Sequence, residues 1–349
     1  MPQDKLVRAA AAAGLLVLSV WVLRTGEALL LPFVCAFILF YLLVNMAHWL
    51  ERLWPLKTAK LPYPVALGAS ILVVGGLLGW AGGLLTTSLI GVVQDAPVYQ
   101  DKAEALLATL QVKYGLVDFN PRPYLADVNF TGIVQKVAKT VSTMASSASL
   151  IVIYTLFLLL ERGSFSGKLH SLCGTEASTR KAQKVLTAIT ADINTYLKIK
   201  TLLSLLTGTA TWAVLTIFGV KYAAFWGIAT FALNFIPTIG SIIAVLMVLP
   251  AAAVQGIDSV QIGLIATLLV AVQFAVGNVL EPKMMGKSLG LSPLAILVSL
   301  AFWGSLWGIM GMLLCVPIMV MLKITLANFT STRWMAILLS QDGTLKEHS

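Results

Sequence analysis

Residues 62–93 form one continuous stretch without a single charged side chain. At about 1.5 Å per residue, a helix of this length reaches roughly 45 Å, which exceeds the roughly 30 Å hydrocarbon core of a bilayer. Only 11% of the 349 residues are charged, whereas soluble proteins average about 25%. So few charges cannot cover a soluble surface of this size, and the sequence therefore predicts an all-α integral membrane protein.

The excess of positive charge lies in segments beside the apolar stretches. Residues 1–62 hold six basic and three acidic groups, and residues 161–200 hold seven and three. Residues 94–147 are balanced, with five of each. Because basic residues collect in cytoplasmic loops, we expect residues 94–147 outside and both termini in the cytoplasm of a bacterial-type inner membrane. Membrane orientation accounts for the net charge of +9 without a nucleic-acid partner.

Hydrophobic periodicity divides the chain into five regions. They are three membrane helices in 1–93, an external polar helical segment in 94–147, a fourth membrane helix with a cytoplasmic amphipathic helix in 148–200, a transport core in 201–330 and a cytoplasmic tail in 331–349. The stretch from Phe130 is expected to run as one helix into the fourth span. Gly75, Gly79 and Gly83 recur every four residues on the third helix and permit another helix to approach closely.

The basic segment before the transport core is predicted to form an amphipathic helix. Its apolar face consists of Val185, Ile189, Ile193 and Tyr196. Such a helix either lies on the inner leaflet of the membrane or packs on neighbouring loops, and the sequence leaves both alternatives open.

The transport core contains two apolar stretches that are too long for one straight span. Residues 222–254 and 291–326 each have a glycine-bearing break near the middle. Each is either a kinked helix or a helical hairpin. Re-entrant hairpins from opposite faces place the lysines of residues 281–288 in the cytoplasm, which fits the charge rule better. Residues 202–254 and 261–326 would then be inverted repeats, an arrangement that indicates a transporter binding site.

This interpretation predicts five or six full membrane helices plus two re-entrant hairpins, so at most eight hydrophobic spans. The candidate solute-binding residues lie at the two breaks and in the span between them. They are Asn234, Pro237, Thr238, Gly240, Ser241, Gln273, Asn278, Trp303, Gly304, Trp307, Gly308 and Gly311.

Each group of candidates has two interpretations. Proline at 237 removes a backbone donor, so Asn234, Thr238 and Ser241 either satisfy the polar groups of the kink or line a polar cavity. The side chains of Gln273 and Asn278 either join helices or contact solute. The two tryptophans either mark the membrane interface or close a pocket at a hairpin tip.

Glu281 ends the span between the two breaks and is the candidate for proton or cation coupling. It either pairs with Lys283 in the headgroup region or, if buried, carries a proton through the transport cycle.

Other chemistries lack their sequence signatures. No cluster of histidine, cysteine or carboxylate residues has metal-ligand spacing, so neither a metal nor a cofactor is expected. Met285–Ser288 resembles the end of a phosphate-binding loop, but Glu281 stands where that loop needs glycine. No intramembrane protease motif occurs, and the chain is therefore not expected to be an enzyme.

Four pieces of the transport core keep their order and spacing: Leu233–Gly240, Gly277–Pro282, Met285–Pro293 and Trp307–Pro317. Together they resemble the autoinducer-2 exporter family of bacterial permeases. One departure is Tyr196, which is followed by leucine where that family often has glycine, so the entry of the amphipathic helix into the membrane stays open.

The resemblance implies movement of a small solute by alternating access, with autoinducer-2 export as the namesake case. It also implies a homo-oligomer, with a pentamer among the options. A sodium or other cation/proton antiporter is the alternative transporter, and a membrane scaffold without transport activity is the alternative from another class.

Overall fold

The computed structural model describes residues 2–53, 62–114, 130–285 and 290–343. These ranges are helical apart from short turns and one isolated bridge between Leu291 and Ser340. The predicted all-α fold is therefore confirmed. Parts of the predicted external segment, of the Met285–Pro293 motif and of the cytoplasmic tail lie outside the described residues.

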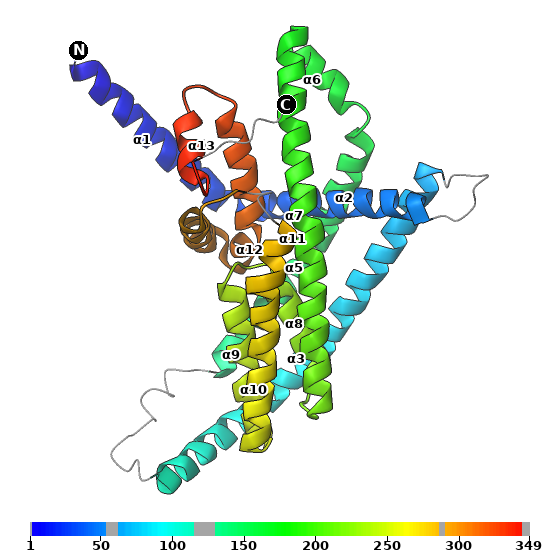
Figure 1. Cartoon of the computed structure of the whole chain (residues 1–349), viewed down its shortest axis with the longest axis vertical. Helices are drawn as coiled ribbons and strands as arrows, with labels where there is room; N and C mark the ends of the chain where they lie inside the picture. The colour runs from blue at the N-terminus through cyan, green and yellow to red at the C-terminus, as the bar shows by residue number, and fades with distance from the viewer. Residues whose placement is uncertain (1, 54–61, 115–129, 286–289, 344–349) are drawn as a thin grey trace. The chain divides into compact units, whose positions relative to one another are not determined.

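Figure 1 labels the helices along the chain. They are α1 (Pro2–Thr25), α2 (Glu27–Leu53), α3 (Tyr63–Tyr114), α5 (Phe130–Glu161), α6 (Phe165–Cys173), α7 (Glu176–Ile217), α8 (Ala223–Leu233), α9 (Ile239–Val254), α10 (Ser259–Phe274), the π-helix η1 (Ala275–Leu280), α11 (Glu281–Met285), α12 (Pro293–Ala327) and α13 (Arg333–Leu339). One tight turn at Gly26 separates the first two helices, and the helix from Phe130 continues unbroken to Glu161, as predicted.

Among the described residues, five helices are long and apolar enough to cross a membrane. These segments are Glu27–Arg52, Tyr63–Val92, Glu176–Ile217, Ser259–Met285 and Pro293–Ala327. Length and composition thus agree with an integral membrane protein that crosses the bilayer several times. The last segment belongs to α12, whose chain reverses inside it, as described below.

The chain forms two compact units. The first comprises Met1–Trp49, Ser147–Asn194 and Ser288–Ser349, and the second comprises Leu50–Ser146 and Thr195–Lys287.

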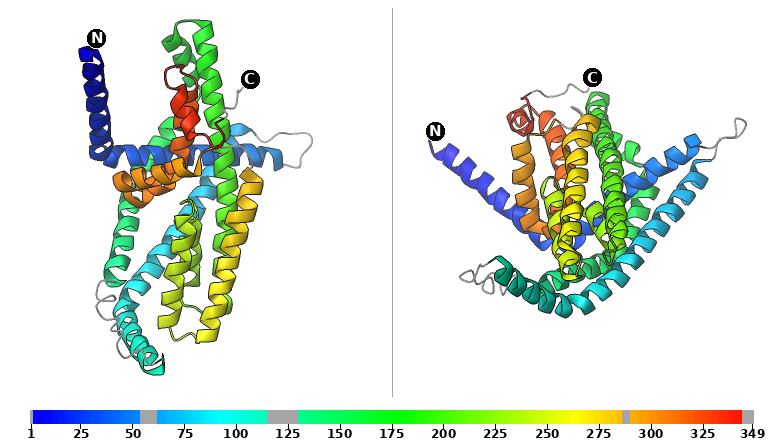
Figure 2. Two further views of the ribbon diagram at one scale, coloured as in Figure 1. Left: turned by 60° about the vertical axis from the view of Figure 1, so that its left-hand side comes forward. Right: turned by 60° about the horizontal axis from the view of Figure 1, so that its bottom comes forward.

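In the second unit, the first broken stretch is a helical hairpin. α8 and α9 lie side by side and are joined by a short turn (Figure 2). With 11 and 16 residues, they measure about 17 Å and 24 Å, so neither arm alone crosses a hydrocarbon core of about 30 Å. Gly240 is buried between the arms, where a methyl group would overlap the backbone carbonyl of Leu233.

In the first unit, α12 also folds back on itself. Its backbone leaves the helical region at Trp307 and Gly308, and Gly308 has a φ of 58°. Ser299 Oγ lies 3.5 Å from the Cys315 carbonyl oxygen, although sixteen residues separate them. A straight helix would place these residues about 24 Å apart. The second broken stretch is therefore a hairpin and not a kinked span.

The two hairpins use glycine in the same way. A methyl group on Gly311 would overlap the Trp303 carbonyl, as one on Gly240 would overlap that of Leu233. The same added methyl groups would also lie close to the side chain four residues earlier, 3.2 Å from Ile236 Cβ and 3.1 Å from Trp307 Cβ. The backbones can approach this closely only because glycine has no side chain. Whether the hairpins re-enter the membrane from opposite faces stays a prediction.

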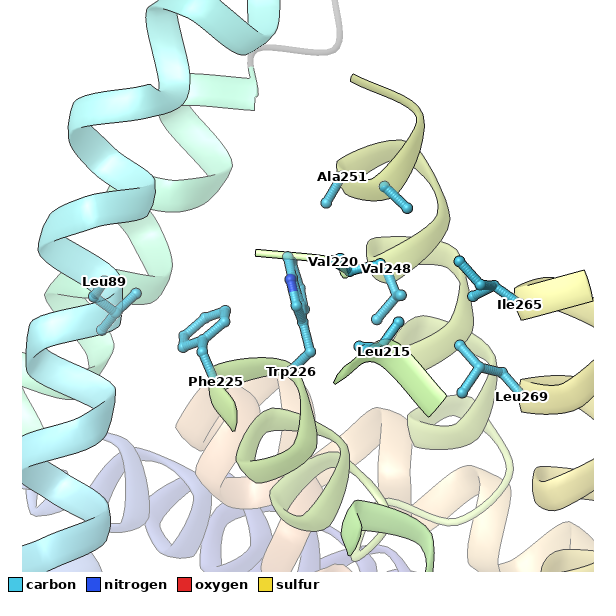
Figure 3. Close-up of a cluster of buried hydrophobic side chains, with 10 residues drawn as sticks. Leu89, Leu215, Val220, Phe225, Trp226, Val248, Ala251, Ile265 and Leu269 are labelled. Atoms are coloured by element: carbon cyan, nitrogen blue, oxygen red, sulfur yellow. The ribbon is translucent and has the colours of Figure 1, made fainter. Parts of the chain in front are cut away.

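An apolar cluster holds the first hairpin within the second unit (Figure 3). It joins one residue of α3 and residues of α7, α8, α9 and α10. The buried side chains are Leu89, Leu215, Val220, Phe225, Trp226, Val248, Ala251, Ala252, Ile265 and Leu269. At the start of α8, Tyr222 packs on Gly91 and its hydroxyl donates to Asp95 Oδ2 at 3.2 Å. These contacts fix the hairpin between α3 and α10.

In the first unit, the predicted amphipathic helix packs on another helix. The Tyr41 hydroxyl of α2 lies 3.0 Å from Thr190 Oγ1 of α7, and Asn45 Nδ2 donates to Asn194 Oδ1 at 2.7 Å. The predicted amphipathic helix and the following span are one continuous helix of 42 residues. The leucine after Tyr196 therefore continues the helix, where a glycine would favour a break.

The glycine stripe of α3 was predicted to allow close packing with another helix. Within the described residues, no atom lies within 4 Å of a methyl group placed on Gly75, Gly79 or Gly83. The stripe thus makes no close contact with the part of the chain that the structure describes. The helix also continues beyond the predicted span, to Tyr114.

The hairpin glycines can be tested against the open glycines of α3. Gly240→Ala should lower the free energy of unfolding by about 1–3 kcal/mol, because the added methyl group meets a backbone carbonyl that cannot rotate away. Gly311→Ala should behave likewise. Thermal unfolding in detergent measures the change. Gly79→Ala, which adds a methyl group in open space, is the matched control, and equal effects at positions 240 and 79 would contradict the hairpin packing.

Candidate functional site

A row of buried polar side chains runs along α7 in the second unit. Lys200, Ser204, Thr207 and Thr211 are spaced by four, three and four residues, so they share one side of the helix. Each is at most 3% exposed. We call these four residues the α7 polar face. Buried polar groups in an apolar helix cost free energy unless they are hydrogen-bonded, so this face requires partners from other helices.

One partner comes from the break of the first hairpin. Asn234 follows the last residue of α8, is 4% exposed, and its Nδ2 donates to Ser204 Oγ at 3.0 Å. Thr207 bonds within its own helix, to the carbonyls of Leu203 and Ser204. Asn234 thus satisfies a polar group of another helix and also places the hairpin turn beside α7.

A glycine contact allows this close approach. A methyl group on Gly208 of α7 would lie 2.8 Å from the Gly227 carbonyl of α8. One on Gly227 would lie 2.9 Å from the Gly208 carbonyl and 2.8 Å from Trp212 Cβ. Small residues at such crossings let helix backbones touch in membrane proteins. The Gly208–Gly227 crossing therefore holds α8 against the α7 polar face.

The second partner is Glu281. Its Oε1 lies 2.7 Å from Lys200 Nζ, and the exposed fractions of the two side chains are 25% and 3%. The partner of Glu281 is therefore a buried lysine of α7, and the sequence-based pairing with Lys283 was wrong. Glu281 directly follows η1, the π-helical segment of the span. Such segments are uncommon and occur frequently at functional sites.

The α7 polar face brings Asn234 and Glu281 together. Lys200 and Ser204 are four residues apart and are neighbours on the helix surface. Their respective partners, Glu281 and Asn234, therefore meet adjacent positions of one face. In the sequence these partners lie in separate motifs. Asn234 of the first break and Glu281, the candidate coupling residue, thus contact the same face of α7.

The other predicted residues of the first break differ in exposure. Thr238 is exposed and has a φ of 59°. Residues branched at Cβ rarely adopt this conformation, which costs about 1–3 kcal/mol and is most often retained at functional sites. Pro237 and Ser241 are half-buried, and Gly240 has the packing role described above.

The two polar residues of the following span are not equivalent. Gln273 Oε1 is buried and accepts no hydrogen bond from the residues that the structure describes. Asn278 lies in the π-helical segment and is exposed. Of these two side chains, Gln273 is therefore the one with a buried polar atom that bonds to none of the described residues.

The predicted residues of the second hairpin belong to the first unit. Trp307 is 5% exposed, and its Nε1 donates to the Leu23 carbonyl of α1 at 3.0 Å. It thus satisfies a carbonyl in the last turn of α1, and the two sequence-based interpretations of the tryptophans stay predictions. Trp303 packs against Trp307 with ring centroids 4.9 Å apart. Gly304 lies against Met312, and Gly308 forms the exposed turn.

Sequence reasoning missed most of the α7 polar face. The sequence analysis counted Lys200 only among the basic groups of residues 161–200 and did not single out Ser204, Thr207 or Thr211. The signal was present, because polar residues spaced four, three and four apart in an apolar helix form a stripe. Nothing in the sequence indicated that Glu281, which lies 81 residues after Lys200, faces the same stripe.

No group of three or more histidine, cysteine or carboxylate residues that could hold a metal ion occurs in the described part of the chain. The site therefore consists of one ammonium group, one carboxylate, hydroxyl groups and amides. Such a set can bind a polar solute by hydrogen bonds or exchange a small ion at the charged pair.

Comparison with known proteins identifies relatives of the whole chain. The family model described as "AI-2E family transporter" matches residues 11–331. The AI-2 transport protein TqsA of Escherichia coli K12 is 30% identical over 333 residues, which cover 94% of each chain. A candidate transport protein of Borreliella burgdorferi is 35% identical over 69% of this chain and 67% of its own length. YhhT of Escherichia coli K12, also described as a candidate transport protein, is 40% identical over 42% of each chain.

The bond between Asn234 and Ser204 can be measured by a double-mutant cycle. Asn234→Ala, Ser204→Ala and the double variant should give a coupling energy of about 0.5–1.5 kcal/mol, the range of interhelical hydrogen bonds in membranes. Thermal unfolding of the purified variants supplies the free energies. Asn278→Ala combined with Ser204→Ala serves as the control and should be additive. Additivity for the Asn234 pair as well would show that the bond contributes nothing.

Proposed function

The chain belongs to the AI-2E transporter family, and we propose that it moves a small solute as a secondary transporter with alternating access. The observation that carries this proposal is the first hairpin, whose broken end binds a buried polar face of α7. Polar and ionisable residues inside membrane helices are costly, and they usually mark the path of a solute or ion.

The details of the hairpin support the same function. Its arms are too short to cross a bilayer, its turn contains the strained and exposed Thr238, and Asn234 connects it to α7. Interrupted helices of this kind form the substrate sites of many secondary transporters. In this proposal, Asn234, Thr238 and Gln273 contact the solute, and Glu281 exchanges a proton or cation.

The name of the Escherichia coli relative suggests autoinducer-2 or a similar small polar solute as the substrate. Hydroxyl and amide groups of the site suit such a molecule, because they both donate and accept hydrogen bonds. A cation/proton antiporter is the second candidate, and the Lys200–Glu281 pair is the observation that favours it. The remaining parts of the proposal are an inner-membrane location with cytoplasmic termini, inverted repeats and a homo-oligomer.

A scaffold without transport activity is the alternative from another class. A scaffold has no need for a strained exposed turn, a buried ion pair and a π-helical segment within one unit. Flux through the purified chain separates the two functions.

The test uses proteoliposomes that contain only this chain. Uptake of labelled autoinducer-2 and cation-driven proton movement, reported by an internal pH dye, are measured in parallel. We expect flux in at least one assay. Asn234→Ala and Thr238→Val should each lower that flux about tenfold or more, because a lost solute contact of about 1.4 kcal/mol corresponds to a tenfold change. No flux of either kind would favour the scaffold.

Ser204→Ala is the matched control for Asn234→Ala. It removes the same interhelical bond but leaves the Asn234 amide in place. If Asn234 contacts solute, Asn234→Ala should lose much more flux than Ser204→Ala at similar thermal stability. Equal losses that follow the loss of stability would make Asn234 a structural partner of the break.

A further inference from the structure

The two charges of the Lys200–Glu281 pair lie at different depths. The Lys200 side chain is 3% exposed and the Glu281 side chain is 25% exposed, with 2.7 Å between Nζ and Oε1. The carboxylate is thus the accessible partner, and the ammonium group lies behind it. A solute or ion that reaches this pair meets the carboxylate first.

The two groups cannot change charge independently. A buried charge that loses its partner is strongly destabilising, whereas a buried pair is tolerated. If Glu281 takes up a proton or a metal cation, the Lys200 ammonium loses its counter-charge and must move. If Glu281 is the coupling residue, a second side chain must therefore move during the cycle. That side chain is Lys200, because its ammonium group contacts the Glu281 carboxylate.

We propose that Lys200 is a resident cation that competes with a transported monovalent cation, a proton or Na⁺, for Glu281. This inference rests on the proposed function and names the residue that couples it. When a cation binds Glu281, the ammonium–carboxylate contact breaks and Lys200 keeps its proton. For a proton, one O–H bond forms at the carboxylate. When the cation leaves, Lys200 returns.

The α7 polar face connects this exchange to the hairpin. Ser204 is the neighbour of Lys200 on the same face and already accepts a hydrogen bond from Asn234. A serine hydroxyl can accept two hydrogen bonds, so a displaced ammonium group finds an acceptor there. A hydrogen bond from the Lys200 ammonium group to Ser204 Oγ then weakens or reorients the hydrogen bond that Asn234 Nδ2 donates to the same oxygen. Cation binding at Glu281 thereby changes the strength of the hydrogen bond that joins the first hairpin to α7.

The surroundings favour a cation over an anion. An anion would have to pass the Glu281 carboxylate to reach Lys200. The accessible group of the pair is therefore negative, which attracts positive charge and repels negative charge.

The first readout is cation binding by the purified full-length chain, measured as the shift of its thermal unfolding with Na⁺ at constant pH and with pH at constant Na⁺. The two titrations distinguish Na⁺ from protons. Lys200→Met removes the competing charge. Because the Lys200 ammonium occupies the Glu281 site most of the time in the wild-type chain, the half-saturating concentration of the bound cation should fall by about tenfold or more. Lys200→Arg should keep the wild-type value. Lys198→Met, which changes an exposed lysine two residues away, is the matched control.

The second readout is flux in proteoliposomes. Lys200→Met/Glu281→Gln removes both charges, which protein interiors usually tolerate, and keeps the test usable if a single variant does not fold. We expect this double variant to exchange solute without any dependence on a cation or pH gradient, whereas Lys200→Arg stays coupled. Wild-type-like cation titrations in Lys200→Met, or a gradient dependence that survives in the double variant, would overturn the inference.

The outcomes also separate this inference from the proposed function. A wild-type chain without any flux contradicts the proposed function, while the binding titrations still decide the role of Lys200. A wild-type chain that transports solute with no response to Na⁺ or pH in either readout contradicts the inference and leaves solute transport intact.

Discussion

A buried polar group in an apolar helix costs free energy unless another group of the protein bonds to it, and this constraint organises the contacts of the α7 polar face. The α7 polar face places a lysine, a serine and two threonines in an otherwise apolar helix. Asn234 and Glu281 are the partners that other helices supply. Without the ammonium–carboxylate pair and the amide–hydroxyl bond, the burial of this face would cost several kcal/mol. The first hairpin, the crossing at Gly208 and Gly227, and the π-helical segment before Glu281 all serve to bring these partners into place.

Glycine determines how closely the hairpin arms approach. Gly240 and Gly311 each lie on a carbonyl at the end of the preceding arm, and no other residue fits there. The two hairpins share this contact although their sequences differ and they belong to different units. The similarity is what two copies of one ancestral element would show, and it supports the proposal of repeats. The relative orientation of the copies remains part of that proposal.

The fold followed from the sequence to a large extent, because charge depletion and helix length are local signals. The uncharged stretch at 62–93 was sufficient to predict an all-α membrane protein, whereas the overlong broken stretches left kinked helices and hairpins both open and the lysines of residues 281–288 favoured hairpins. The continuous α7 was not anticipated, since the basic segment before residue 200 suggested a separate amphipathic helix, either on the membrane surface or packed on neighbouring loops. Packing of Tyr41 and Asn45 of α2 against that half of α7 explains its course.

The candidate site was predicted only in part. Asn234 and Glu281 were chosen because they interrupt or end apolar stretches, which is a local property. That both residues contact α7 depends on how distant segments of the chain pack together. No spacing in the sequence therefore reveals that Lys200 contacts Glu281. Trp307 was chosen for its place in a glycine-rich break, which is also a local property and does not reveal that the indole bonds to another helix. Its indole caps α1.

The central claim is that the turn of the first hairpin opens to water within the membrane-embedded chain. Thr238→Cys, in a background with Cys35, Cys173 and Cys315 replaced, tests this claim in proteoliposomes with a small water-soluble thiol reagent. Leu246→Cys on the same hairpin, an exposed apolar position of α9, is the comparison. The account predicts rapid labelling at 238, slow labelling at 246 and a change at 238 when substrate is added. An inert cysteine at 238, or equal labelling at both positions, would contradict it.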